Sequence, residues 1–366
     1  MENFRILTKD SGTSARAGLL KTAHGNVETP VFMPVGTAGA VKGITPAQLK
    51  ETNASIILAN TYHLFLRPGL ETIENLGRLH KFMNWDGPIL TDSGGYQVFS
   101  LNSLVKIGEE GVEFASHIDG SKVYINAEIA TNIQNRLGVD IAMCFDQCTA
   151  YGANPEEVEK AVDRTIRWAK RCKDAHNNEN QHLFAIVQGG IDEELRRKCA
   201  LELTKTDFDG FAIGGLSVGE GHENMIKTVE HTIQYLPENK PRYLMGVGTP
   251  KDIVAAVRAG IDMFDCVLPT RNGRNAFAFT QKGPIRLRNN AHINDIEPIE
   301  DDCNCYCCQN FSRGAIRHFF NSGEMLGPIL VSLHNLTFYQ RLMSQIRNKI
   351  KDGDFDKWSK EFSIDN

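Results

Sequence analysis

The stretch Ile261-Asp262-Met263-Phe264-Asp265-Cys266-Val267-Leu268-Pro269-Thr270-Arg271-Asn272-Gly273-Arg274 shows most directly how this chain folds. A short apolar run, Ile261–Phe264, ends on the carboxylate of Asp265. We expect a turn at Pro269 and then a flexible basic loop with two arginines. By itself, this pattern is explained by a capped strand and a solvated basic turn. The alternative is a strand-end carboxylate beside phosphate-binding side chains, as chemistry on a nucleic acid requires.

The same unit, a short apolar run closed by a polar residue or glycine, occurs eight times. The runs are Val31–Val35, Ser55–Ala59, Pro88–Thr91, Val139–Phe145, Leu183–Val187, Gly210–Ile213, Arg242–Met245 and Ile261–Phe264. Amphipathic segments with helix-start signals separate most of them: Thr45–Asn53, Asn154–Asn177, Asp192–Leu203, His222–Leu236 and Thr249–Ala259. Eight buried strands alternating with helices predict an α/β fold, a (β/α)8 TIM barrel. A doubly wound open sheet is the alternative, although no Gly-x-Gly-x-x-Gly motif follows the first run.

Three regions depart from this repeat. Residues 1–30 predict an N-terminal β-hairpin. Residues 104–126, with the hairpin signal Asp119-Gly120, predict an insertion over the barrel mouth. We therefore expect the barrel, with this inserted hairpin, over residues 1–274. A C-terminal subdomain with helices packed on the barrel is expected over residues 275–366.

Composition excludes several classes of protein. Of the 366 residues, 41% are hydrophobic and 23% are charged, and the net charge is −5, so the chain as a whole is not a basic nucleic-acid binder. We see no apolar run of ~18 residues and no signal peptide, so we expect a cytoplasmic protein without a membrane span. Basic residues nevertheless gather late in the chain, which predicts a local polyanion-binding patch. They are Arg271, Arg274, Lys282, Arg286, Arg288, Arg313, Arg317, Arg341, Arg347, Lys349 and Lys351.

The cysteine cluster predicts a metal site. The motif Cys303-x-Cys305-x-x-Cys308 is followed by His334, and three thiolates with one imidazole form a closed tetrahedral zinc set. Since protein ligands fill every position, the expected cofactor is one structural zinc ion per subunit, in a C-terminal zinc-binding subdomain. Cys307 also lies in the cluster, and spacing alone does not exclude it as a ligand.

Polar side chains at the strand ends predict a binding site. In a barrel the carboxyl ends of the strands meet, which brings together Asp92, Asp146, Gln188, Gly215 and Asp265. Three carboxylates around one pocket repel each other unless they are protonated, bind a ligand or take part in catalysis. The set therefore indicates function, although each alone could be a strand cap. In Asp92-Ser93-Gly94-Gly95-Tyr96-Gln97 the glycines allow close approach of a ligand, and Tyr96 can stack on a planar one.

Several long motifs together resemble the bacterial-type tRNA-guanine transglycosylases, also called queuine tRNA-ribosyltransferases. They are Thr91–Gln97, Ile186–Gly190, Gly214–Glu220, Tyr243–Gly248, Phe264–Arg271 and the cysteine–histidine set, and the resemblance covers nearly the whole chain. It implies a pentosyltransferase of queuosine biosynthesis that replaces guanine at wobble position 34 of G-U-N anticodons with preQ1. The implied partners are the tRNAs for Asp, Asn, His and Tyr with a U-G-U loop sequence, the bases preQ1 and guanine, and a second copy of the chain in a homodimer.

The resemblance also implies roles for residues. Asp265 would be the nucleophile that forms a covalent RNA–enzyme intermediate, and Asp92 the general acid and base. Substrate binding would involve Asp92, Ser93, Gly94, Gly95, Tyr96, Asp146, Gln188, Gly215, Leu216 and Met245. RNA binding would involve Gly246, Val247, Gly248, Thr249, Pro250, Lys251, Asp252, Thr270, Arg271, Asn272, Gly273 and Arg274. The zinc ligands would be Cys303, Cys305, Cys308 and His334.

Three details refine this comparison. Val218 and Cys148 are similar to the bacterial form, which takes preQ1 and not queuine. Gln147 departs from the usual pattern, in which Glu follows Asp146. Two other functions remain as alternatives: a non-catalytic RNA-binding subunit, expected to lack Asp92 or Asp265, and a nucleoside hydrolase, which gives no reason for the basic C-terminal third.

Overall fold

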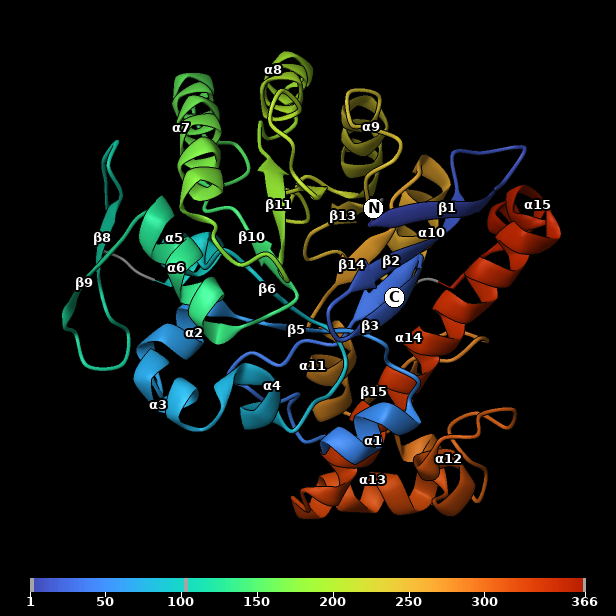
Figure 1. The fold of residues 1–366 in the computed structure, drawn as a ribbon. Coiled ribbons are helices and arrows are strands. Elements are labelled where there is room, and N and C mark those ends of the chain that lie inside the picture. Colours follow the sequence, from blue (N-terminus) through green and yellow to red (C-terminus); the bar gives the residue numbers. More distant parts are fainter. Residues whose placement is uncertain (1–2, 102–104, 365–366) are drawn as a thin grey trace.

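Eight parallel strands form the centre of the molecule in a computed structural model that describes residues 3–101 and 105–364 (Figure 1). The strands are β4 (Val31–Met33), β5 (Ile57–Ala59), β6 (Ile89–Thr91), β10 (Ile141–Met143), β11 (His182–Val187), β12 (Gly210–Ile213), β13 (Arg242–Leu244) and β14 (Met263–Asp265). They pair in the order β4-β14-β13-β12-β11-β10-β6-β5, and a parallel bridge between Val35 and Leu58 joins the two ends. The predicted barrel is therefore confirmed, and each of the eight runs overlaps one of its strands.

The continuous apolar character of the runs follows from burial on both faces. In β4, Val31 and Met33 belong to the cluster inside the barrel, whereas Phe32 belongs to the cluster between the barrel and its helices. Tyr243 of β13 also lies in the inner cluster and is fully buried. Because side chains alternate along a strand, neither face has a polar stripe, and helix cover on both sides is required.

Among the residues that the structure describes, ten helices belong to the barrel region. They are α1 (Pro46–Glu51), α2 (Thr61–Leu66), α3 (Leu70–Asn75), α4 (Arg78–Met83), α5 (Gly95–Leu101), α6 (Ala127–Leu137), α7 (Pro155–Ala175), α8 (Glu193–Leu203), α9 (His222–Ile233) and α10 (Pro250–Ala259). The predicted helix starts are confirmed where a cap was recognised: the side chains of Thr45, Asn154, Asp192 and Thr249 each accept a backbone N–H of the first turn.

A three-stranded antiparallel sheet covers the N-terminal end of the barrel. It consists of β1 (Phe4–Lys9), β2 (Arg16–Thr22) and β3 (Gly25–Thr29), and the expected hairpin is its β2–β3 part. Phe4, Leu20 and Val27 pack into the cluster inside the barrel. This sheet therefore closes the end opposite to the catalytic end of barrels.

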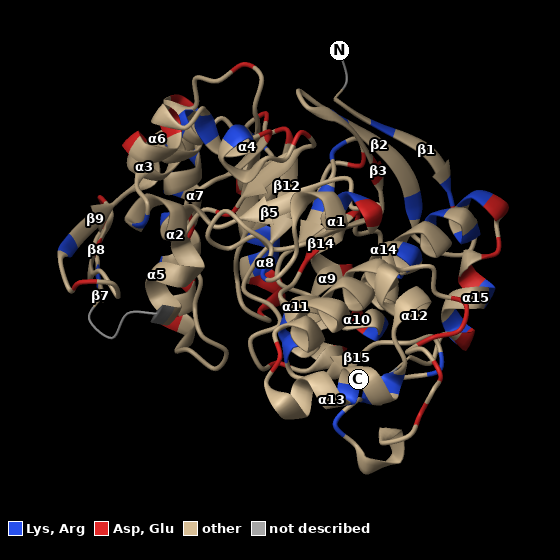
Figure 2. Ribbon diagram, turned by 90° about the horizontal axis from the view of Figure 1, so that it is seen from below, with Lys and Arg blue, Asp and Glu red and all other residues tan. Residues whose placement is uncertain are grey.

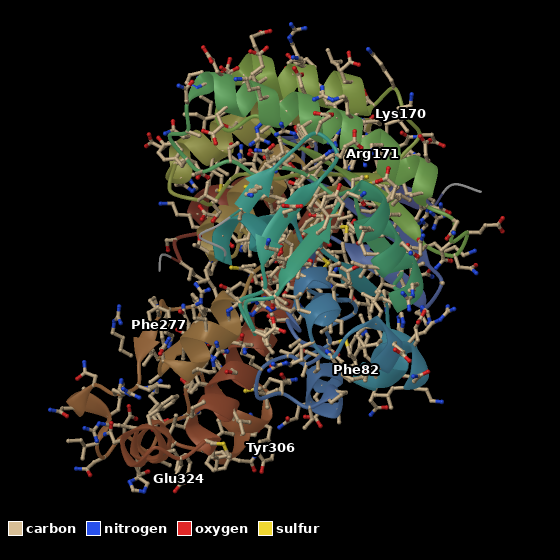
Figure 3. All side chains as sticks on the ribbon, turned by 90° about the vertical axis from the view of Figure 1, so that its left-hand side faces the viewer. Phe82, Lys170, Arg171, Phe277, Tyr306 and Glu324 are labelled. Carbon is tan, nitrogen blue, oxygen red and sulfur yellow. The ribbon has the colours of Figure 1, made fainter. Side chains whose placement is uncertain are left out.

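The insertion forms a sheet that packs against α7, and its His117 contacts His63, which comes from α2; its expected place over the barrel mouth stays a prediction. It forms β7 (Val105–Ile107), β8 (Val112–Ala115) and β9 (Lys122–Ile125), while position 104 of the predicted insertion lies outside the described residues. Its Glu109 carbonyl accepts the Trp168 indole N–H of α7 at 2.7 Å, and Arg171 of α7, labelled in Figure 3, donates to the Glu110 carbonyl at 3.0 Å. These contacts hold the sheet against the flank of α7.

The chain after β14 forms a helical region built around one long helix. Its elements are α11 (Leu268–Arg274), β15 (Phe277–Ala278), β16 (Ile285–Arg286), the 3-10 helix η1 (Asn290–His292), α12 (Tyr306–Asn310), α13 (Arg313–Ser322), α14 (Leu326–Asp352) and α15 (Phe355–Glu361). α14 runs from this region to the barrel, where Gln340 donates to the Phe32 carbonyl at 3.1 Å (Figure 1). No helix among residues 3–101 and 105–364 has the length and apolarity needed to cross a bilayer.

The prediction of a flexible basic loop after Asp265 was wrong, because residues 268–274 form helix α11. Pro269 lies in the first turn, where its missing N–H is not needed. A Cβ atom at Gly273 would lie 2.6 Å from the Ser332 backbone, so this glycine allows α11 to pack closely on α14. Glycine in this segment suggested flexibility, but its tertiary contact shows that it serves packing.

Candidate active site

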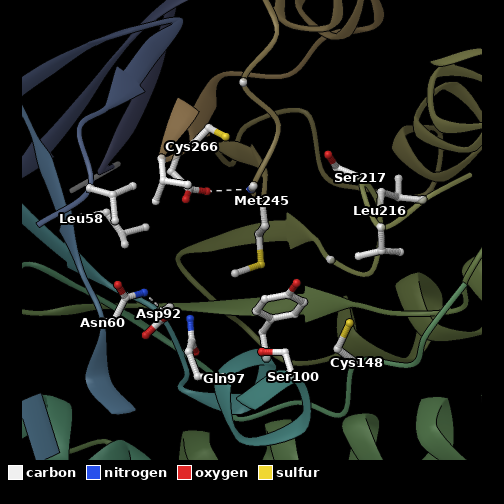
Figure 4. Close-up of a pocket in the computed structure, with 18 of the residues that line it drawn as sticks. Leu58, Asn60, Asp92, Gln97, Ser100, Cys148, Leu216, Ser217, Met245 and Cys266 are labelled. Carbon is white, nitrogen blue, oxygen red and sulfur yellow. Dashed lines mark hydrogen bonds between the residues drawn. The ribbon is translucent and has the colours of Figure 1, made fainter. Parts of the chain in front are cut away.

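A pocket of about 490 Å³ lies where the carboxyl ends of the barrel strands meet (Figure 4). Parallel strands all point the same way, so residues that close different strands gather at one end of the barrel. The lining therefore takes five polar residues and one glycine from segments far apart in the chain: Asn60, Asp92, Asp146, Gln188, Asp265 and Gly215. The volume suits a small planar heterocycle with its ribose.

Asp265 ends β14 and is held by two donors. Its Oδ1 atom accepts the Tyr243 hydroxyl at 2.6 Å and the Gly246 N–H at 2.7 Å. Burial raises the pKa of Asp265, and these two hydrogen bonds oppose the rise by stabilising the carboxylate. Both recorded bonds use one oxygen, which leaves Oδ2 without a recorded partner among the described residues and available to react.

Asp92 lies at the end of β6 with a different set of partners. Its Oδ2 accepts a hydrogen bond from the Asn60 side-chain amide at 2.6 Å (Figure 4), and its Oδ1 accepts one from the Thr61 N–H at 2.8 Å. Burial raises the pKa of Asp92 to about 6 against these bonds, with a contribution from the negative charge of Asp265. A carboxyl group with a pKa near neutrality can both donate and accept a proton at physiological pH.

Asp146 and Gln188 form a hydrogen-bonded pair at the pocket wall. Asp146 accepts Ser93 Oγ at 2.8 Å and Gln188 Nε2 at 2.7 Å, and burial raises its pKa while these bonds oppose the rise. Gln188 Oε1 is buried and has no partner among the described residues. Beside it, Gly215 has φ +69°, and a Cβ atom there would lie 2.4 Å from Gln188 Oε1. The wall thus offers acceptors and requires glycine at this position.

The remaining residues expected to bind substrate divide into lining and supporting positions. Ser93, Tyr96, Leu216 and Met245 line the pocket, and the Met245 side chain points into it (Figure 4). The tyrosine is 53% exposed, so one face of its ring is open to a ligand. Gly94 and Gly95 are not part of the lining. A Cβ atom at Gly95 would lie 2.7 Å from the Asp146 carbonyl, so this glycine supports the wall from behind.

The residues expected to bind RNA also divide. Gly246, Gly248, Thr249 and Arg271 line the pocket. The others lie outside the lining: Val247, Pro250, Lys251, Asp252, Thr270, Asn272, Gly273 and Arg274. Pro250 to Asp252 form the first turn of α10, and Thr270 to Arg274 belong to α11, so both segments stand at the rim as helices.

Some lining residues had no role in the sequence analysis. Asn60 directly follows the run Ser55–Ala59 and was given no role, although it donates a hydrogen bond to Asp92. Tyr243 lies inside an apolar run, and its role could not be seen because sequence does not show which face of a strand is inside. His63 also lines the pocket and comes from α2, a helix that the sequence analysis did not predict. In contrast, Gln147 is not part of the lining, and its side chain accepts a hydrogen bond from Arg164 of α7.

Fewer basic residues of the C-terminal third are available for an RNA-binding patch than the composition suggested. Five of its members pair with carboxylates: Arg313, Arg341, Arg347, Lys349 and Lys351. The other six have no ion pair recorded among the described residues: Arg271, Arg274, Lys282, Arg286, Arg288 and Arg317. Figure 2 shows basic residues around α11 and α13. These six cations thus belong to the segment from α11 to α13 and not to α14.

Three cysteines and a histidine form a buried group that could bind a metal ion. Cys303, Cys305, Cys308 and His334 provide it, and their sulfur atoms lie 3.7, 3.7 and 3.3 Å from His334 Nδ1. A tetrahedral zinc ion would place nitrogen and sulfur ligands about 3.6 Å apart. His334 Nε2 is 2.8 Å from the Phe279 carbonyl, which leaves Nδ1 free as a ligand. Cys307 is buried beside this group but is not part of it.

A second group, His24, His80 and Asp140, has a different character. The two imidazole rings stack with centroids 3.7 Å apart, and each bonds a different Asp140 oxygen, at 2.9 and 3.0 Å. The lone pair of an imidazole nitrogen lies in the plane of its ring, and these two planes are stacked, so both rings cannot direct a lone pair at one ion. Burial would raise the Asp140 pKa, but hydrogen bonds from His80, the Ile89 N–H and His24 lower it to about 2. We interpret this group as a hydrogen-bonded clamp.

Comparison of the sequence with known proteins shows the family to which this chain belongs. The family described as Queuine tRNA-ribosyltransferase matches residues 10–365. A queuine tRNA-ribosyltransferase from Thermoanaerobacter sp. (strain X514) is 55% identical over 360 residues, covering 98% of this chain and 96% of the relative. A protein of the same name from Francisella tularensis subsp. novicida (strain U112) is 52% identical over 359 residues, covering 98% and 97%. This chain therefore belongs to the queuine tRNA-ribosyltransferase family.

Proposed function

We propose that this chain is a pentosyltransferase that replaces guanine at wobble position 34 of G-U-N anticodon tRNAs with preQ1, a step of queuosine biosynthesis. The observation that carries the proposal is the pocket itself, where two buried carboxylates with raised pKa, Asp92 and Asp265, face the Asp146–Gln188 pair. This combination provides a nucleophile, an acid and a set of groups for a base edge in one cavity of a family member.

The first half of the reaction uses Asp265 as nucleophile. Its free Oδ2 attacks C1′ of the ribose, the C1′–N9 bond breaks, and the bonding electrons leave with guanine. Asp92 donates its proton to the leaving base, so that guanine departs neutral. The Tyr243 hydroxyl and the Gly246 N–H hold Oδ1 and fix the attack geometry. The product is a covalent ester between the protein and the RNA.

The second half reverses the direction of proton transfer. Asp92, now ionised, takes the N9 proton of the incoming base, whose nitrogen attacks C1′ and releases the Asp265 carboxylate. Two displacements at the same carbon retain its configuration, as in retaining glycosidases. A pKa of about 6 at Asp92 suits a group that must act first as an acid and then as a base.

The walls of the pocket account for the choice of base. Asp146 accepts the N–H groups of a guanine-like edge, the Gly215 N–H serves its oxygen, and Tyr96 and Met245 enclose its faces. Val218 and Cys148 line the same pocket, where the resemblance to the bacterial form favours the small aminomethyl group of preQ1 over queuine.

The remaining parts of the proposal concern partners and organisation. The rim helices α10 and α11 would contact the anticodon loop of the tRNAs for Asp, Asn, His and Tyr, which must splay out its base to react. Residues 275–366 would form a zinc-binding subdomain around one structural zinc ion, with C-terminal helices packed on the barrel of residues 1–274. The protein would act in the cytoplasm as a homodimer.

The decisive experiment is incorporation of labelled guanine into a G-U-N anticodon stem-loop. Incorporation should require the U-G-U sequence, shown by loss of activity when uridine 33 is replaced by adenosine, and unlabelled preQ1 should block it better than queuine. A stem-loop that binds without exchange would make this chain an RNA-binding subunit. Turnover of free guanosine would instead indicate a nucleoside hydrolase.

A second test isolates the nucleophile. The Asp265→Asn variant should form no covalent RNA adduct on denaturing gels while still binding the stem-loop. Asp119→Asn, in an exposed turn of the inserted sheet, controls for the chemistry of the substitution and should form the adduct normally. An adduct that persists in Asp265→Asn would disprove this assignment.

A further inference from the structure

A fully buried arginine lies behind the wall of the pocket. Arg196 of α8 has no exposed surface, and its three guanidinium nitrogens each donate one hydrogen bond of 2.8 Å to a backbone carbonyl. The acceptors are the carbonyls of Gly190, Val187 and Gly214. No ion pair to Arg196 is recorded among the residues that the structure describes. A buried cation without a carboxylate is costly, so carbonyl groups arranged this closely indicate a specific use.

The three carbonyls belong to the two segments that form the base-reading wall. Val187 immediately precedes Gln188 at the end of β11, and Gly214 immediately precedes Gly215 at the end of β12. The Gly214 N–H also donates to the Val187 carbonyl at 3.1 Å, so one guanidinium fixes both strand ends together. Arg196 itself does not line the pocket, whereas Gln188, Gly214 and Gly215 do.

The three hydrogen bonds of Arg196 also fix the direction of a backbone N–H at the pocket. The Gly214 carbonyl and the Gly215 N–H belong to the same planar trans peptide, so they point in opposite directions. With the oxygen held toward Arg196 behind the wall, the N–H is held toward the side of the cavity. No hydrogen bond from this N–H to a described residue is recorded, so it remains free for a ligand.

The charge of Arg196 also strengthens that donor. Burial lowers the pKa of Arg196 to about 10, which leaves the guanidinium charged at neutral pH. A hydrogen bond from a cation to a peptide carbonyl polarises the whole peptide group and makes its N–H a better donor. The Asp146 carboxylate and Gln188 Oε1, which belong to the same wall of the pocket as the Gly215 N–H, are acceptors. The 6-oxygen is the acceptor on the edge of guanine, so donor and acceptor match.

We propose that Arg196 is a positioning residue, which holds the Gly215 N–H as the donor for the 6-oxygen of the base and so sets the preference for 6-oxo purines. This inference rests on the function proposed above. Lysine cannot replace the arginine, because one ammonium group cannot span three carbonyls that a planar guanidinium reaches with separate N–H groups.

The test compares two bases that differ at one atom. Guanine and 6-thioguanine present the same N–H groups, but sulfur is a weak acceptor. Their dissociation constants are measured by calorimetry on the zinc-loaded protein without RNA, for the wild type, Arg196→Met and Arg196→Lys. Arg242→Met is the matched control: Arg242 is also buried, donates to the Leu236 carbonyl at 3.2 Å, and lies at the start of β13, at the opposite end of the barrel.

We expect the wild type to prefer guanine, and both Arg196 variants to weaken guanine binding on the order of tenfold while 6-thioguanine changes little. The ratio of the two constants should therefore fall toward one. Arg242→Met should lower the melting temperature and keep the ratio. An unchanged ratio in Arg196→Met, or in Arg196→Lys if the first variant does not fold, would overturn the inference. An equal loss of affinity for guanine and 6-thioguanine would also overturn the inference.

The two proposals can fail separately. A wild type that binds guanine and never exchanges it into RNA would refute the proposed reaction, while the ratio would still report on Arg196. A wild type that exchanges guanine, with the same ratio in all variants, would refute only the positioning role. A wild type without any preference between the bases would exclude the Gly215 N–H as the determinant of the 6-oxygen.

Discussion

Replacing the buried acid Asp92 by asparagine should stabilise the fold and remove the exchange activity. Asp92 is buried, and its pKa rises from 3.8 to about 6 on folding because ionisation is unfavourable in this pocket. Below pH 3.8 both the folded and the unfolded chain are protonated here, and the group has no effect on stability. Above pH 6 both are ionised, and the folded state carries the full penalty.

The size of the effect follows from this difference in pKa. A difference of about two pH units corresponds to about 3 kcal/mol at pH 8, and at pH 5 roughly half of it remains. For a chain of 366 residues, an unfolding entropy of about 2.1 cal/mol/K per residue converts this into about 4 °C at pH 8 and about 2 °C at pH 5. Asparagine also loses one of the two hydrogen bonds from Asn60 and Thr61, but that loss does not depend on pH.

The measurement is the melting temperature of wild type and Asp92→Asn between pH 5 and pH 8, with equal zinc content. Asp140→Asn is the control, because its pKa is lowered to about 2 and its ionisation stabilises the fold, so this variant should melt below the wild type at neutral pH. The reasoning is refuted if the difference between Asp92→Asn and wild type does not grow with pH, or if Asp140→Asn changes stability in the same direction.

Three further predictions follow from the site. Cys305→Ser should lose zinc and expose residues 275–366 to proteolysis, whereas Cys307→Ser should keep both metal and protection; equal zinc contents would exclude the ligand set given above. Arg271→Ala should weaken stem-loop binding and reduce the slope of log affinity against log salt by roughly 0.7. Arg341→Ala, which removes a partner of Glu300, should leave that slope unchanged, and equal slopes in both variants would argue against a phosphate contact at Arg271. Gly248→Ala would place a Cβ atom 2.2 Å from Cys266 Cβ, next to Asp265, so exchange should slow and the melting temperature should fall; a wild-type rate would contradict the rigid packing seen here.

The barrel and the centres of its site could be predicted because they depend on local patterns. A strand buried on both faces must be apolar throughout, and a parallel strand must be followed by a return connection, so the eight runs and their helices can be read from sequence. The polar residue that ends each run then lies at the same end of the barrel. This is why the sequence alone is enough to group Asp92, Asp146 and Asp265, which all line the pocket.

Other features depended on contacts that no local pattern reports. Glycine in Thr270–Arg274 indicated a loop, but packing on Ser332 makes the segment a helix. The hydrogen bonds from α7 to the Glu109 and Glu110 carbonyls, which hold the inserted sheet, join segments about 60 residues apart. The basic residues of α14 were counted toward an RNA-binding patch, but their carboxylate partners include residues as distant in sequence as Glu28.

The sequence by itself thus determined the architecture, the family and the identity of the reactive groups, since periodicity and motif spacing lie within short stretches of chain. Only the tertiary structure decided the state of those groups. The pKa of Asp92 depends on burial and on Asn60, and the direction of the Gly215 N–H depends on Arg196, which is brought there by α8. Electrostatic environment and hydrogen-bond direction arise between segments that meet only when the barrel closes, and for that reason they cannot be read from the order of residues.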